Sequence, residues 1–324
     1  MTTLFRRSAL AATLALTAAF AGAPAFAQQA PAPVLTKPQA GWYRFMVGDA
    51  EVTALSDGTV TLESNILTGV KPAHVQELLK AAHATGALHT SVNAFLVKTG
   101  DKLVLVDTGA GTFFGPSLNK LQASLKAAGY MPDQVTDILI THLHADHVGG
   151  LVNGETIVFP NATVHADKRE LGYWLDAAKM EAAPKEAQGF FKMAQAALGP
   201  YQKAGKVAPF EGEVPLAPGI KSWPTPGHTP GHSFYVLESK GQKIVFWGDL
   251  MHFEEVQFPE PPITVAFDVD SKAARAQRLK AFADAARQGY LVAPAHVTFP
   301  GVGHLKKAGS GYVWLPVRYV NDSH

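Results

Sequence analysis

Four side chains of the kinds that bind metal ions lie within six consecutive residues, His142-Leu143-His144-Ala145-Asp146-His147. This His-x-His-x-Asp-His run directly follows residues 138–141, an apolar segment typical of a β-strand. Imidazole nitrogens and carboxylate oxygens suit Zn²⁺ and similar divalent ions. Four such groups in one short loop are more than a single ion usually accepts. The spacing therefore predicts two ions, with neighbouring side chains directed at different ones.

Three later residues extend the candidate ligand set to seven. His228 lies in the run 225–232, Asp249 ends the apolar run 244–249, and His296 ends the run 293–296. Each stands at the end of an apolar segment, where a strand delivers a ligand to one rim of a sheet. A cluster of surface histidines is the alternative, but the strand contexts and the spacing favour a metal centre.

The order and context of these residues resemble the metallo-β-lactamase superfamily over most of the chain. The resemblance implies that His142, His144 and His228 hold one ion, most often Zn²⁺. Asp146, His147 and His296 then hold the other, with Asp249 bridging the two. It also implies a hydroxide between the ions that attacks an electrophile, so that Asp146 and Asp249 act in catalysis as well as in binding. No Gly-x-Ser-x-Gly nucleophile elbow is present.

The elements expected around these residues form two similar halves. Alternating segments predict hairpins over 42–47 with 51–55 and over 92–98 with 102–106, a strand over 135–141, and a helix over 117–128 stopped by Gly129. The second half repeats the plan with strands over 243–247 and 290–293 and a helix over 271–287. This pattern predicts an α/β (α+β) fold, an αββα sandwich of two mixed β-sheets flanked by helices. Residues 41–324 are expected to form a single domain, with a helical insertion at about 167–200, made of helices over 167–178 and 185–198, that covers the site.

The first 27 residues have the features of a cleaved export signal. Arg6 and Arg7 precede an apolar stretch that ends in the cleavage signal Ala25-Phe26-Ala27, and residues 28–40 are expected to be a flexible N-terminus. We therefore expect a periplasmic or secreted protein without a stable membrane anchor, exported by either the Sec or the twin-arginine route. Removing the signal changes the formal net charge from +1 to −1, and no basic stripe is visible, so nucleic acid is not an expected partner. The absence of cysteine excludes disulfides and thiolate ligands.

Other polar residues have two possible roles each. Asp107, at the end of the strand 102–106, is expected to orient a ligand by hydrogen bonding, or else to be a turn residue. His232 is expected to be structural and not a ligand. His304 either orients the site or is an ordinary loop histidine.

The resemblance narrows to the methyl parathion hydrolase-like subfamily through the stretches 103–110, 140–150, 189–192, 280–286 and 299–304. That subfamily hydrolyses aryl phosphotriesters, its relatives hydrolyse lactones and aryl esters, and a homodimer is implied. Phe114, Trp174 and Phe190 fall where the subfamily has its aromatic substrate pocket. Phe267 and His252 are further candidates for its wall, although core packing is the alternative for any one aromatic residue.

The chain departs from the phosphotriesterase pattern after Asp249, where the segments 251–253 and 265–267 are bulkier and more polar. We therefore favour hydrolysis of lactones or aryl esters, with aryl phosphotriester (organophosphate) hydrolysis as a side activity. A phosphotriesterase as the main activity is the first alternative. A β-lactamase would need a basic carboxylate-binding residue, and a glyoxalase-type thioesterase would need a basic binding site. A non-enzymatic metal-binding module would not need a bridging Asp249.

Overall fold

Two seven-stranded sheets carry the fold of the computed structural model, which describes residues 39–84 and 88–320. The predicted export signal, residues 1–27, and nearly all of the N-terminal segment 28–40 lie outside the described residues. From Ala40 onward the described residues form one compact unit. None of the helices in these residues is both long enough and apolar enough to cross a membrane.

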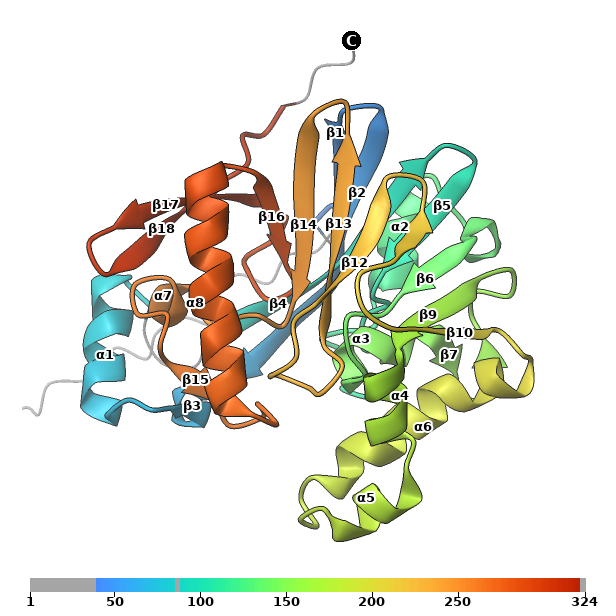
Figure 1. Cartoon of the computed structure of the whole chain (residues 1–324), viewed down its shortest axis with the longest axis horizontal. Helices are drawn as coiled ribbons and strands as arrows, with labels where there is room; N and C mark the ends of the chain where they lie inside the picture. Colours follow the sequence, from blue (N-terminus) through green and yellow to red (C-terminus); the bar gives the residue numbers. More distant parts are fainter. Residues whose placement is uncertain (1–38, 85–87, 321–324) are drawn as a thin grey trace, which may run out of the picture. The chain divides into compact units, whose positions relative to one another are not determined.

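The first sheet combines an antiparallel and a parallel half. Its strand order is β1-β2-β4-β5-β6-β9-β10, antiparallel as far as β5 and parallel beyond it. The predicted hairpins β1–β2 and β4–β5 are confirmed (Figure 1). The strands are β1 Trp42–Val47, β2 Ala50–Leu62, β4 Leu88–Thr99, β5 Lys102–Val106, β6 Asp137–Leu139, β9 Thr163–Asp167 and β10 Val207–Phe210.

The second sheet has the order β11-β12-β13-β14-β16-β17-β18. All of its neighbours pair antiparallel except β14 and β16, which are parallel and are connected through helix α8, Ser271–Gln288. The strands are β11 Pro215–Ala217, β12 Ile220–Pro224, β13 Ser233–Ser239, β14 Gln242–Gly248, β16 Leu291–Pro294, β17 Gly303–Ala308 and β18 Gly311–Pro316.

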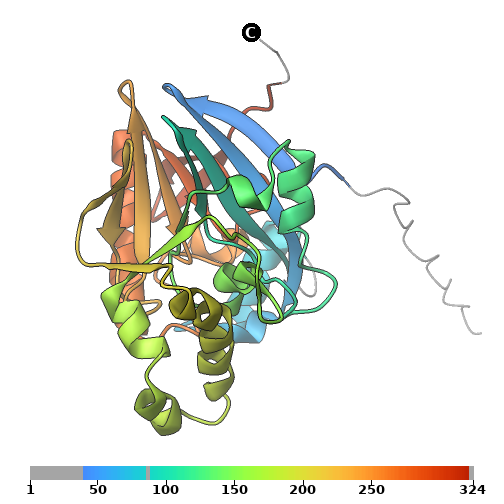
Figure 2. The ribbon, with the colours of Figure 1, turned by 90° about the vertical axis from the view of Figure 1, so that its right-hand side faces the viewer.

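The sheets pack face to face and the longest helices lie outside them, which confirms the predicted αββα sandwich (Figure 2). Between the sheets, apolar side chains such as Phe95 and Leu139 meet Tyr235 and Phe246. Outside the first sheet lie α2 (Leu121–Ala127) and α6 (Gln188–Lys203), and outside the second lies α8. Burying both faces of each sheet against apolar side chains is the principal stabilising contribution expected for such a layered fold.

Helix α2 is shorter than predicted, because it begins at Leu121 and not near residue 117. Asn119 has a left-handed backbone with φ 65°, which cannot continue a helix. The carboxylate of Asp57 accepts hydrogen bonds from the backbone N–H groups of Asn119, Lys120 and Leu121. A side chain that lies about sixty residues earlier in the chain thus sets where the helix starts.

The predicted helical insertion is present as three helices instead of two. Helix α4, Lys168–Trp174, is followed by α5, Ala177–Ala182, and then by α6. Asp167 and Asp176 each cap the following helix by accepting backbone N–H donors, so the second cap interrupts the segment that was predicted to be continuous. The strand predicted over 135–141 is likewise confined to Asp137–Leu139.

The remaining helices and strands are short, and none exceeds ten residues. They are α1 Pro72–Ala81, α3 Ala145–Val148, α7 Glu254–Gln257, β3 Leu67–Thr68, β7 Val152–Asn153, β8 Thr156–Ile157 and β15 Thr264–Val265.

Candidate metal centre

The seven candidate ligands all follow strands at one rim of the sandwich. The run 142–147 comes after β6, and its last residues form the short helix α3. His228 lies in the connection from β12 to β13, Asp249 directly follows β14, and His296 closely follows β16. The two sheets therefore contribute to one centre, as the strand contexts in the sequence predicted.

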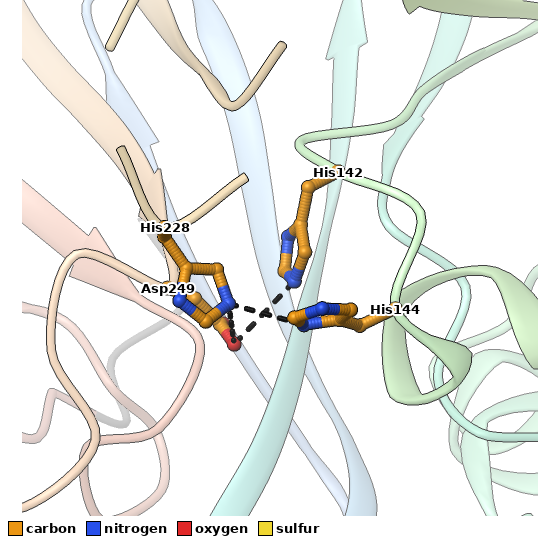
Figure 3. A group of neighbouring side chains, drawn as sticks. All are labelled: His142, His144, His228 and Asp249. Atoms are coloured by element: carbon orange, nitrogen blue, oxygen red, sulfur yellow. Dashed lines mark hydrogen bonds and ion pairs between the residues drawn. The ribbon is translucent and has the colours of Figure 1, made fainter. Parts of the chain in front are cut away.

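Three histidines and one carboxylate oxygen converge in the first half of the centre (Figure 3). Oδ2 of Asp249 lies 3.5 Å from Nε2 of His142 and 3.3 Å from Nε2 of His228. Nε2 of His228 lies 3.1 Å from Nδ1 of His144. These four residues, each with one ligand atom directed inward, make a set that could surround a single ion.

The other carboxylate oxygen of Asp249 faces a second group. Oδ1 lies 3.0 Å from Nε2 of His147 and 3.1 Å from Nε2 of His296. Oδ2 of Asp146 lies 3.7 Å and 3.5 Å from the same two nitrogens. Each carboxylate oxygen of Asp249 thus faces one of the two histidine groups, which is the arrangement that a bridging carboxylate requires.

The chemistry of these atoms fits bound divalent cations. Among the described residues, Nε2 of His142, Nε2 of His147 and Oδ1 of Asp249 are buried and, despite the short distances between these groups, none of the three makes a hydrogen bond. Buried polar atoms without partners are rare in folded proteins, because each costs free energy. Two neighbouring sets of imidazole nitrogens and carboxylate oxygens are a suitable environment for zinc-like ions.

In four of the histidines, Nδ1, the ring nitrogen that points away from the centre, is held by a hydrogen bond. Nδ1 of His147 lies 2.8 Å from Oδ2 of Asp107, the residue predicted for this role. Sequence reasoning missed the other partners, because nothing in their local sequence marks them. They are Asp268 for His228 (2.9 Å), the carbonyl of Ser91 for His296 (2.9 Å), and Oγ1 of Thr141 for His142 (3.1 Å). Such contacts direct the free nitrogen toward the centre.

The charges of the centre shift the protonation of its members in opposite directions. Burial and the neighbouring histidines hold the pKa of His142 well below its ordinary value. Burial also acts to lower the pKa of His147, but Asp249 and Asp146 outweigh it and raise that pKa well above the ordinary value. Burial opposes ionisation of Asp249, yet the surrounding histidines hold its pKa well below the usual range. The bridging position is thereby occupied by a carboxylate anion.

His252, predicted to contact the substrate, also contacts the centre itself. Its Nε2 lies 3.1 Å from Oδ2 of Asp249, and its ring stacks on that of His296 at 5.2 Å. Its Nδ1 is buried and has no partner among the described residues. His252 is therefore both a neighbour of the bridging carboxylate and a part of the cavity wall described below.

Of two further histidines, His232 supports the centre, whereas His304 is not grouped with it. Nδ1 of His232 bonds Oγ1 of Thr225, and its Nε2 accepts the backbone N–H of Asp249 at 3.1 Å, so it supports the loop of that carboxylate. His304 lies in β17, with Nδ1 3.3 Å from the carbonyl of Tyr290, and is not grouped with the centre.

The predicted aromatic pocket is divided between two cavities that border the centre. The smaller, of about 210 Å³, is lined by Phe114, Phe190 and Phe267, by His252, and by four of the candidate ligands, His144, Asp146, Asp249 and His296. The larger, of about 540 Å³, is lined mostly by residues of the helical insertion, among them Trp174 and the same Phe190, together with Phe267. The two phenylalanines thus form a partition, and Trp174 lies in a different cavity from Phe114.

Comparison with known proteins agrees with this geometry. Residues 88–296 match the metallo-beta-lactamase superfamily. The N-acyl homoserine lactonase AiiA of Bacillus thuringiensis subsp. kurstaki is 27% identical over 212 residues, covering 60% of this chain and 76% of the relative. The crystal structure of hydrolase AbOPH in the beta lactamase superfamily superposes with a TM-score of 0.85 at 40% identity, covering 88% of this chain and 100% of that one. AidC, a dizinc quorum-quenching lactonase in complex with a product, gives a TM-score of 0.81 at 29% identity, covering 87% and 99%.

Proposed function

The chain belongs to the metallo-beta-lactamase superfamily as a dinuclear metal-dependent hydrolase, and from this we propose that it is a zinc enzyme that hydrolyses lactones and aryl esters. We further propose that it falls in the methyl parathion hydrolase-like part of the superfamily and retains aryl phosphotriester hydrolysis as a side activity. The observation that carries the substrate proposal is the small cavity, which is lined both by aromatic side chains and by four of the candidate ligands.

Two bound divalent ions supply an activated hydroxide and polarise the carbonyl group of the substrate. The chain's own residues prepare that chemistry. Asp249 holds the two ligand groups at a fixed separation through its two oxygens. The carboxylate of Asp107 accepts the hydrogen bond from Nδ1 of His147 and so directs Nε2 of that ring toward the centre. The aromatic walls, Phe190 and Phe267 above all, exclude water from the space in which an ester would lie.

His252 contributes a distinct restriction on what can be bound. Because Nε2 lies against the carboxylate of Asp249, the ring proton belongs on that nitrogen. Burial lowers the pKa of His252, which keeps the ring neutral, and Nδ1 is buried without a partner among the described residues. The residue lines the small cavity, where an imidazole without a further partner is poorly solvated against the alkoxy groups of a phosphotriester.

A flat lactone fits this cavity better than a tetrahedral phosphotriester. Aromatic faces such as Phe114 and Phe190 stack on a planar ring, and such contacts contribute beyond the area they bury. A phosphotriester carries two alkoxy arms besides its leaving group, and His252 and Phe267, in edge-to-face contact at 5.5 Å, crowd one of them. The adjoining larger cavity, of about 540 Å³, offers room for a side chain on a bulkier lactone.

The test is a panel of kcat/KM values on dihydrocoumarin, N-acyl homoserine lactones, naphthyl acetate, methyl paraoxon and nitrocefin. We expect kcat/KM for dihydrocoumarin to exceed that for methyl paraoxon by at least ~10-fold, a difference in activation free energy of only about 1.4 kcal/mol. His252→Leu should reduce this ratio by raising kcat/KM for the phosphotriester. His304→Leu is the matched control, since that histidine lies apart from the centre, and it should leave the ratio unchanged.

Equal or faster turnover of methyl paraoxon by the unchanged enzyme would refute the cavity argument and favour the alternative, a phosphotriesterase. That alternative has its own support in the aromatic pair Phe114 and Phe190, which would also hold an aryl leaving group. Nitrocefin as the preferred substrate would point instead to a β-lactamase.

A further inference from the structure

Glu170, on helix α4 of the insertion, is a buried acid that the proposed reaction does not use. Its side chain is 1% exposed, and no salt bridge reaches it within the part of the chain that the structure describes. Burial raises the pKa of Glu170 above its ordinary value, although hydrogen bonds from the backbone N–H groups of Leu143 and Gly231 act to lower it. A carboxyl group in such a position is costly unless it is well satisfied by donors, so its retention calls for a structural or functional reason.

Three donors converge on this carboxyl group. Oε1 accepts the backbone N–H of Leu143 at 2.9 Å and the indole N–H of Trp174 at 2.7 Å. Oε2 accepts the backbone N–H of Gly231 at 2.8 Å. In these contacts the carboxyl group of Glu170 meets three N–H donors and no acceptor. An ionised carboxylate suits such a position best, because it can only accept hydrogen bonds.

Each donor belongs to a different part of the centre. Leu143 lies between His142 and His144, and Gly231 lies three residues after His228, so the two backbone donors are in the two loops that supply one ion's histidines. Trp174 stands edge-on to the ring of His144, with ring centroids 5.2 Å apart. One side chain therefore joins both ligand loops and the wall of the larger cavity.

The fit between Glu170 and the second loop is close. A Cβ atom on Gly231 would lie 2.3 Å from the backbone nitrogen of Glu170, a distance that no side chain can adopt. Glycine at this position lets the 225–232 loop rest directly on helix α4. The hydrogen bond to Oε2 then holds the loop in that contact.

We propose that Glu170 is a positioning residue for the ion held by His142, His144 and His228, because its carboxylate fixes the two ligand loops at one separation and ties Trp174 to them. The inference rests on the proposed dinuclear function. It assigns to the helical insertion a role in metal binding, in addition to covering the cavity.

The informative variant is Glu170→Gln, which keeps the shape but replaces one oxygen with an NH₂ group. If the amide oxygen faces Leu143 and Trp174, the NH₂ group meets the N–H of Gly231, and the reverse orientation sets it against the other two donors. Either way one loop loses its acceptor. Glu181→Gln, at an exposed position of helix α5, is the matched control.

The measurement is a stepwise zinc titration against a chelator, together with the thermal unfolding midpoint of the metal-free proteins. We expect one of the two ions to bind ~10- to 100-fold more weakly to Glu170→Gln, the usual effect of removing a contact behind a ligand. The other ion should bind with nearly unchanged affinity, and Glu181→Gln should behave like the unchanged protein. Unchanged affinity for both ions, with only a lower unfolding midpoint, would show a purely structural role and overturn the proposal.

A second variant covers the case in which Glu170→Gln does not fold. Gly231→Ala leaves the carboxylate in place and pushes the loop away from helix α4, so the affinity for the same ion should fall. Retention of both ions at full affinity by Gly231→Ala would contradict the proposal. The readout needs no substrate, so an absence of lactone hydrolysis would count against the proposed function alone. A single zinc ion in the unchanged protein would count against the dinuclear centre itself.

Discussion

Replacing Asp107 with Asn should weaken the binding of the second ion, the one assigned to Asp146, His147 and His296. The carboxylate accepts three hydrogen bonds of 2.8 Å each, from the backbone N–H and hydroxyl of Thr141 and from Nδ1 of His147. Asp107 has φ 58°, a left-handed conformation that Asn adopts readily, so the substitution changes the charge and one acceptor without straining the backbone.

The size of the effect follows from those contacts. If the amide oxygen of the new Asn keeps the backbone bond to Thr141, its NH₂ group faces Nδ1 of His147. The histidine must then carry its proton on Nε2, the nitrogen that should bind the ion, or lose the hydrogen bond altogether. A hydrogen bond to a charged group contributes about 1.5–3 kcal/mol. This corresponds to roughly 10- to 150-fold in affinity, at about 1.4 kcal/mol per factor of ten.

The assay is again a zinc titration with a competing chelator, followed by metal analysis after dialysis. Asp137→Asn is the matched control, because Asp137 also pairs with a histidine, His165, at 3.0 Å but lies outside the centre. We expect one ion to be weakened in Asp107→Asn and neither in the control. Two ions bound with unchanged affinity, or both lost to the same degree, would refute the assignment. Combined with Glu170→Gln, the substitution should weaken both ions, because the two changes act on different ligand groups.

Three other predictions concern the bridge, the processing and the assembly of the protein. Asp249→Ala should lose both ions together with activity, and metal analysis that finds one fully retained ion would argue against a shared carboxylate. Exported protein should begin at Gln28 by intact-mass measurement, whereas a cytoplasmic pool that retains the complete N-terminus would contradict cleavage after Ala27. The protein should be a homodimer, and light scattering that gives only the monomer mass at micromolar concentration would exclude this.

Much of the fold could be predicted from local sequence. The hairpin β4–β5 and helix α8 follow from alternation, turn residues and helix-ending glycine within short windows. The positions of the candidate ligands were predictable for a similar reason, because each lies in a segment that follows a strand. His142 and Asp249 illustrate this, since their strands lie in different sheets and still end at the same rim.

The remaining features depend on partners that are distant in sequence. The start of α2 depends on Asp57, and the orientation of His296 depends on a backbone carbonyl at Ser91 that no side-chain pattern can reveal. Glu170 was not predicted, because an acid on a short helix has the same local sequence whether it faces solvent or a ligand loop. The division of the aromatic pocket was also not visible, since Phe190 and Phe267 are 77 residues apart in the sequence and meet only in the fold.

The origin of the proposed ligands in both sheets has a consequence for how the protein matures. Four of the seven precede residue 148, whereas Asp249 and His296 come late in the chain and follow β14 and β16, which pair with each other. During synthesis, neither ion can gain its full coordination until the second sheet has formed and docked on the first. Bound divalent ions would then cross-link the two halves, and an ion present at ~1,000 times its dissociation constant would stabilise the folded state by about 4 kcal/mol. On this reasoning metal binding would complete folding, and the supply of metal where the chain folds would set how firmly the two halves are joined.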